Sequence, residues 1–224
     1  MVLRLIIQTL FAVAGMAALL FVLAGTLHWR GAQIFLAAMA GGGLLMGLWL
    51  ARRDPALLKE RIGSSRQKNT LADRILMPLL GLAFCAWLVF MALDARRHGF
   101  SQMPEWLNFA AGAAIVVGFI GVVRVFRENS FASREVKVQK DRGQRVIAKG
   151  PYVIVRHPLY SAAIFTYFAI PLALGSWAGF LAVPLLILGL VIRTLVEERV
   201  LKEQLEGYGD YMAKVRYRFV PYVW

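Results

Sequence analysis

Long apolar segments separated by polar loops dominate the sequence pattern. A membrane span needs about 20 apolar residues, and four segments have that length: Leu5–Leu27, Gly31–Leu50, Ile75–Leu93 and Trp106–Val125. A fifth apolar region, Leu159–Ile192, is too long for one span and is interrupted at Gly175. We interpret it as a tight helical hairpin that need not cross the membrane completely. The pattern predicts an all-α, polytopic membrane helix bundle with four spanning helices and a C-terminal helical hairpin.

Composition supports a membrane protein, since 59% of the 224 residues are hydrophobic and the mean hydropathy is +0.60. The net charge is +13, but the basic residues flank apolar segments, which indicates membrane topology and anionic lipid headgroups rather than nucleic acid. The single cysteine, Cys85, excludes intramolecular disulfides and cysteine-based metal clusters. The three histidines lie far apart without ligand spacing, so we predict no metal site.

The basic residues are distributed unevenly between the loops. The N-terminus, the second loop, residues 124–156 and the tail from Arg193 together carry 23 lysines and arginines, whereas the first and third loops carry 3. In the second loop they are Arg52, Arg53, Lys59, Arg61, Arg66, Lys68 and Arg74. Because cytoplasmic loops carry the excess of positive charge, we expect both termini to be cytoplasmic. Within the second span, Gly43 and Gly47 form a Gly-x-x-x-Gly pattern that permits close helix packing.

Candidate chemistry is concentrated in residues 150–160, Gly-Pro-Tyr-Val-Ile-Val-Arg-His-Pro-Leu-Tyr. Pro158 suits the first turn of a helix, so Arg156 and His157 should lie just before a helix N-terminus, which favours anions. In an extended approach to Pro158 these two side chains would point to opposite sides. A simpler interpretation is a positively charged membrane flank with Tyr160 as an interfacial anchor. The polar stretch 127–149 before this motif is compatible with a short hairpin or with an irregular interfacial loop.

A pair of glutamates provides the second candidate feature. Helical projection of residues 191–205 places Glu198 on the apolar face and Glu197 at its edge, one turn after Arg193. A buried carboxylate is costly unless it is paired, so Glu198 needs a cation or a ligand. A purely structural ion pair, for example with Arg156, is the alternative to a role in chemistry.

The Gly-Pro-Tyr…Val-Arg-His-Pro-x-Tyr motif followed by Glu197-Glu198 resembles the isoprenylcysteine carboxyl methyltransferase family, over about residues 124–224. That family comprises integral-membrane enzymes that use S-adenosylmethionine. The resemblance implies one integral-membrane domain, with spanning helices in residues 1–123 and a cofactor-binding and catalytic region in residues 124–224. It also implies a bacterial inner-membrane location, and the charge asymmetry places the cofactor pocket on the cytoplasmic side.

The same resemblance implies roles for individual residues. Arg156 and Glu198 would be catalytic, and the cofactor contacts would come from Tyr152, His157, Tyr160, Glu197, Glu198 and Arg218. We expect His157 to face the cofactor and Arg156 to face a lipophilic or lipid-linked acceptor, among membrane lipids. Leu159 at the variable motif position and the loosely matching tail argue against assigning a prenylcysteine substrate.

Two other functions remain open. A membrane sterol-type reductase has a similar Arg-His-Pro-x-Tyr motif and binds NADPH, but usually carries Asn where Leu159 stands and has more helices. In a non-catalytic membrane scaffold, Glu198 would be only salt-bridged. Binding of S-adenosylmethionine, of NADPH, or of neither separates the three functions.

Overall fold

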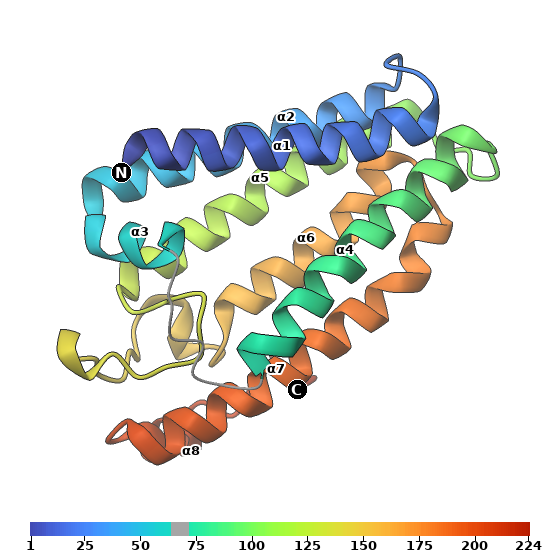
Figure 1. Cartoon of the computed structure of the whole chain (residues 1–224). Coiled ribbons are helices and arrows are strands. Elements are labelled where there is room, and N and C mark those ends of the chain that lie inside the picture. Colours follow the sequence, from blue (N-terminus) through green and yellow to red (C-terminus); the bar gives the residue numbers. More distant parts are fainter. Residues whose placement is uncertain (64–71) are drawn as a thin grey trace.

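The computed structural model describes residues 1–63 and 72–224, and these residues form helices and loops without a β-strand (Figure 1). One layer contains the helices α1 (Val2–Ala24), α2 (Arg30–Arg53) and α5 (Glu105–Glu128). The other contains α4 (Met77–Ala92), α6 (Pro158–Leu174) and α7 (Val183–Gln204). Two shorter helices, α3 (Pro55–Ile62) and α8 (Tyr208–Lys214), lie at one end of the bundle. The predicted all-α polytopic bundle is confirmed.

Within residues 1–63 and 72–224, five helical stretches are long and apolar enough to cross a membrane: Val2–Ala24, Arg30–Arg53, Arg74–Arg97, Glu105–Glu128 and Ala178–Gln204. The first four correspond to the predicted spans; the third is α4 with its flanking turns η1 (Ala72–Leu76) and η2 (Leu93–Arg97).

The two arms of the C-terminal hairpin differ in length. Its first arm, α6, has 17 residues, whereas its second arm, η5 (Ala178–Ala182) continued by α7, has 27. The apolar run stops at Ile192, but backbone hydrogen bonding continues the same helix to Gln204, so this arm is long enough to cross. The polar last turns of α7 therefore extend beyond the apolar part of the bundle.

Small residues allow the helices of the first layer to approach closely. A Cβ atom on Gly42 would lie 2.2 Å from the Phe119 ring of α5, and one on Gly47 would lie 2.6 Å from the Leu5 side chain of α1. The predicted close packing is confirmed at Gly47 but not at Gly43, around which nothing lies within 4 Å, and Gly42 makes the close approach to α5 instead. The large, fully buried side chains at the centre of the bundle include Phe35, Leu20, Leu88, Met91, Ile115, Ile170, Leu174 and Leu186.

A polar cluster joins the connections at the end of the bundle opposite the termini. The buried Asp94 carboxylate accepts hydrogen bonds from the hydroxyls of Ser101 and Ser176, both at 2.6 Å. Ser176 Oγ in turn accepts from the Gly179 amide at 2.9 Å. The cluster ties the turn between α6 and η5 to the connection that follows α4.

Both termini lie at the other end, together with α3, α8 and the connection from α5 to α6 (Figure 1). The basic residues of the second loop that the structure describes lie at this end, as the charge asymmetry predicts. Arg66 and Lys68 of the same loop lie outside the described residues. A second apolar core here packs α3 and α8 against the bundle through Leu50, Leu57, Phe126, Tyr152, Leu205 and Tyr208. This second core forms the floor under the candidate site.

Candidate active site

The connection from α5 to α6 folds across the end of the bundle and encloses a cavity against α6, α7 and α8. The cavity contains about 850 Å³ of empty space, including the part that is open to solvent. Its charged wall residues are Glu135, Lys137, Arg145, Arg156, Arg193 and Glu197, and its aromatic wall includes Tyr152, Tyr160, Tyr208 and Tyr211. Aromatic and apolar walls that carry a few placed polar groups are typical of small-molecule sites.

The motif begins with a turn that requires glycine. Gly150 has φ +55°, and a Cβ atom there would lie 2.6 Å from Glu128 Cγ. Pro151 then opens a short helical turn, η4 (Gly150–Val153), which places Tyr152 in the cavity wall. The Tyr152 hydroxyl accepts from Asn129 Nδ2 at 2.7 Å, and its carbonyl accepts from the Tyr211 hydroxyl at 2.8 Å.

Arg156 and His157 directly precede α6, as predicted, and His157 is the N-cap residue. Their amides donate to the carbonyls of Tyr217 and Arg218, both at 2.9 Å, so the C-terminal tail folds back across the motif. In a regular extended strand, successive amides point to opposite edges. Because both amides meet the same tail segment here, the approach to Pro158 is not regularly extended.

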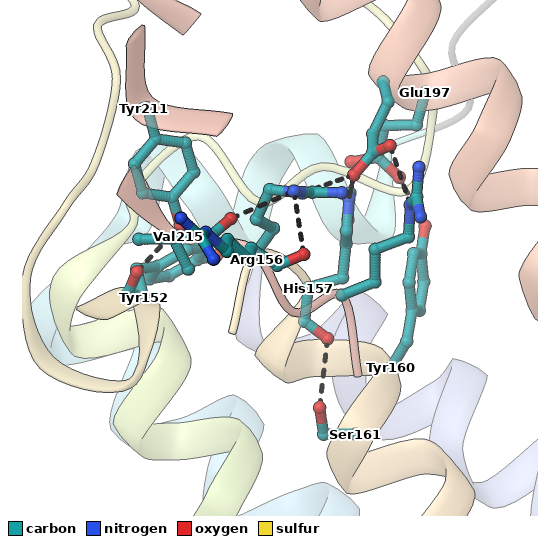
Figure 2. A network of polar contacts seen from close by, with 11 residues as sticks. Tyr152, Arg156, His157, Tyr160, Ser161, Glu197, Tyr211 and Val215 are labelled. Atoms are coloured by element: carbon teal, nitrogen blue, oxygen red, sulfur yellow. Dashed lines mark hydrogen bonds and ion pairs between the residues drawn. The ribbon is translucent and has the colours of Figure 1, made fainter. Parts of the chain in front are cut away.

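Glu198 lies at the centre of a cluster that includes Arg156 and His157, whose side chains are shown in Figure 2. Its Oε1 accepts from Arg156 Nε at 2.7 Å and lies 3.2 Å from His157 Nε2, and its Oε2 accepts from Arg218 Nε at 2.9 Å. The expectation that Arg156 and His157 point to opposite sides is therefore wrong, because it assumed an extended backbone. The predicted burial of Glu198 is confirmed, since its residue is only 5% exposed.

Arg156 also links this cluster to the tail. Its Nη1 donates to the carbonyls of Val215 and Arg216 at 3.0 and 3.1 Å. The guanidinium is thus held by a carboxylate on one side and by two carbonyls on the other, while the residue still lines the cavity. Glu198 and Arg218 are not among the cavity-lining residues; they lie behind Arg156 and His157, where Arg218 also packs over the Trp224 ring at 4.4 Å.

Tyr160 and Glu197 form the part of the wall that faces the cavity. The Tyr160 hydroxyl donates to Glu197 Oε2 at 2.6 Å and accepts from Arg193 Nε at 2.8 Å. The His157 ring stacks on Tyr160 with centroids 5.6 Å apart and an interplanar angle of 12°. The predicted proximity of Arg193 to Glu197 is therefore realised through the shared Tyr160 hydroxyl.

The loop at residues 129–149 is irregular and contains no strand, which decides between the two alternatives for this stretch. Gln139 is 3% exposed and holds the loop together through two hydrogen bonds. Its side-chain Nε2 donates to the Phe131 carbonyl, and its backbone N–H donates to Gln144 Oε1. Arg61 of α3 anchors the loop from below, with Nη1 donating to the Ala132 carbonyl at 2.8 Å. None of these contacts was foreseen, because polar loop residues carry no periodic signal of burial.

Burial alters the acid–base properties of several wall residues outside the spanning helices. It raises the pKa of Tyr152 and Tyr208, and it raises the pKa of Tyr211 to about 12, so these phenols remain protonated hydrogen-bond donors at neutral pH. Burial, together with the neighbouring Arg134, lowers the pKa of Arg61 to about 10, which still leaves the guanidinium charged. The wall therefore combines fixed cations, carboxylates and neutral phenols.

These groups suit a ligand that carries charges of both signs and a planar or apolar part. Residues 106–208, from α5 to the first residue of α8, match the phospholipid methyltransferase (PEMT) family. This is the isoprenylcysteine carboxyl methyltransferase-like family, so the resemblance drawn from the motifs is confirmed over that segment. No curated protein matches the chain.

Proposed function

We propose, from the premise that residues 106–208 are those of a phospholipid methyltransferase-family segment, that the chain methylates a lipophilic or lipid-linked acceptor using S-adenosylmethionine. The family supports membrane methyl transfer. The observation that carries the proposal is the cavity itself, whose wall brings Arg156, His157, Tyr160 and Glu197 together at one end of a membrane helix bundle.

The residues of the cavity fit S-adenosylmethionine by their chemistry. The cofactor has a carboxylate, an ammonium, a sulfonium, a ribose diol and an adenine. Arg145 and Arg156 offer donors for a carboxylate, and Glu197 offers an acceptor for cationic or hydroxyl groups. Tyr152 and Tyr208 offer flat surfaces against which an adenine can pack. When bound, the cofactor supplies an electrophilic methyl group that the acceptor attacks directly.

The side chains of the chain contribute mainly by positioning. Arg156 is fixed by Glu198 and the tail carbonyls, so its charge is held in place before a ligand arrives. Leu159, Leu201 and Leu205 supply the apolar part of the wall, where a lipophilic acceptor can rest. The folded-back tail and the loop cover this end of the bundle and limit water access. Direct displacement needs little acid–base machinery, so orientation and exclusion of water supply most of the rate enhancement.

The proposal places this site at the cytoplasmic face of a bacterial inner membrane. The 23-to-3 charge asymmetry supports that orientation. A water-soluble cofactor then enters from the cytoplasm, and an apolar acceptor enters from the lipid.

Titration of the purified protein in lipid nanodiscs with S-adenosylmethionine and with NADPH tests the proposal. We expect S-adenosylmethionine alone to bind and labelled methyl groups to appear in the lipid fraction. Glu197→Gln should weaken binding roughly ten- to a hundredfold, as expected for one charge-assisted hydrogen bond. Glu203→Gln, an exposed change on the same helix, is the control. Binding of NADPH, or of neither cofactor, would reject methyl transfer in favour of a reductase or a scaffold.

A further inference from the structure

Glu135 brings a carboxylate into the cavity wall from the loop that follows α5. Its Oε2 atom is buried and has no hydrogen-bond partner. Lys137 Nζ forms an ion pair with this oxygen at 3.7 Å, which is too long for a hydrogen bond. Lys137 instead donates to Glu60 at 2.8 Å. The cavity wall thus contains a buried carboxylate oxygen that has an ion-pair contact with Lys137 but no hydrogen bond.

The other two carboxylates at this site have hydrogen-bond partners. Glu198 uses both oxygens for Arg156, His157 and Arg218, and Glu197 Oε2 accepts from Tyr160. Buried polar atoms in native proteins nearly always have a partner, and an exception needs a physical explanation. A carboxylate oxygen without one keeps its full desolvation cost. Among residues 1–63 and 72–224, Thr194 Oγ1, inside α7, is the other buried side-chain oxygen without a partner.

The backbone around Glu135 is held from both sides, so the side chain is presented by a fixed support. Ser133 Oγ donates to the Glu135 carbonyl at 2.7 Å. Arg193 Nη2 donates to the carbonyl of the preceding residue, Arg134. The first of these bonds is local, whereas the second ties the loop to α7, the helix that carries Glu197. Glu135 and Glu197 therefore belong to one connected wall, from different segments of the chain.

We propose that Glu135 is a ligand-binding residue whose Oε2 accepts a hydrogen bond from a cationic ammonium group held in the cavity. This proposal rests on the proposed methyl transfer. Two groups have this chemistry there: the ammonium of the cofactor's amino-acid part and an amine on the acceptor. A carboxylate accepts several hydrogen bonds, and a charge-assisted bond to an ammonium satisfies the orphaned oxygen best.

Calorimetric titration with S-adenosylhomocysteine and with 5′-methylthioadenosine distinguishes the two sources. Both ligands carry the adenosine, but only the first carries the ammonium. Glu135→Gln is compared with Glu60→Gln, which also removes a carboxylate partner of Lys137 but does not line the cavity. If the cofactor supplies the ammonium, Glu135→Gln weakens S-adenosylhomocysteine binding about ten- to a hundredfold and leaves 5′-methylthioadenosine unchanged.

If the acceptor supplies the ammonium, both cofactor analogues bind Glu135→Gln normally and KM for lipid vesicles rises by a similar factor. Glu135→Asp, which keeps the charge on a shorter side chain, should lose less than Glu135→Gln and serves if the glutamine variant folds poorly. Equal behaviour of the Glu135 and Glu60 variants in every assay overturns the assignment. Failure of the unchanged protein to bind S-adenosylhomocysteine overturns the proposed function and this inference together.

Discussion

Replacement of Glu198 by glutamine tests whether the cation cluster behind the cavity holds this end of the protein together. The carboxylate accepts from Arg156 and His157 through Oε1 and from Arg218 through Oε2. A glutamine keeps one carbonyl oxygen, but its amide group donates hydrogen bonds and would face another donor. It can therefore satisfy one side of the cluster and not both, and it removes the negative charge.

The loss of unfolding free energy expected for Glu198→Gln follows from the burial of the Arg156–Glu198 ion pair. Arg156 and Glu198 have side chains that are 5% and 6% exposed, so little solvent screens their interaction. Removal of one partner from a buried ion pair costs about 3–5 kcal/mol of unfolding free energy. Arg218, with a side chain 24% exposed, adds less. For a protein of this size, 1 kcal/mol shifts Tm by about 2–4 °C, so Glu198→Gln should lower Tm by roughly 6–20 °C.

Thermal unfolding in nanodiscs measures this effect, and cofactor titration of the same samples measures the second consequence. Glu203→Gln on the exposed face of α7 is the matched control and should leave Tm within about 1–2 °C, because isolated surface changes cost little. Glu197→Gln should show the opposite balance, with a smaller change in Tm and a larger loss of cofactor affinity. If Glu198→Gln and Glu203→Gln unfolded at the same temperature, the cluster would contribute nothing to stability, and its structural role would have to be abandoned.

Three further predictions concern topology and the two ends of the bundle. Reporter fusions after Lys59 and Trp224 should report the cytoplasm and one at His98 the opposite side; an external Trp224 would contradict the charge argument. Gly150→Ala should destabilise the fold by about 1–2 kcal/mol, measured by Tm, because its positive φ disfavours a side chain; an unchanged Tm would show that the turn relaxes. Asp94→Asn should lower the free energy of unfolding by about 1–3 kcal/mol, because it weakens the two serine hydrogen bonds. Cofactor affinity should not change, since Asp94 lies at the end of the bundle opposite the cavity; a reduced affinity would contradict this.

The helices and the approximate place of the site could be predicted from the sequence because both depend on local regularities. Bilayer thickness fixes the length of an apolar span, and helical periodicity placed Glu198 on a buried face. The continuation of α7 beyond the apolar run was also predicted, because residues 191–205 were projected as a helix. Hydropathy falls after Ile192, but the amphipathic turns that follow continue the helix to Gln204, and these turns carry both glutamates.

The loop and the partners of the motif could not be predicted, because they depend on contacts between distant segments. Arg61 reaches Ala132 across 71 residues, and Arg156 reaches the carbonyl of Arg216 across 60. No local pattern signals such pairs. The orientation of Arg156 and His157 was misjudged for the same reason, since the tail that bends the backbone there is remote in sequence. Glu135 gave no signal at all, because a glutamate in a polar loop is ordinarily solvated.

The adjacency of Glu197 and Glu198 shows how helix geometry divides two tasks between identical side chains. Successive residues on a helix point about 100° apart, so one carboxylate faces the cavity with Tyr160 while the next meets Arg156 and Arg218 behind it. Glu198 fixes the guanidinium groups of Arg156 and Arg218, whereas Glu197 lines the cavity, where it can meet a ligand. A shift of α7 by one residue would leave one glutamate in these two environments and bring Val196 or Arg199 into the other. The register of α7 is therefore as important to the site as the glutamates themselves, and the buried contacts of Arg193 and Glu198 keep it.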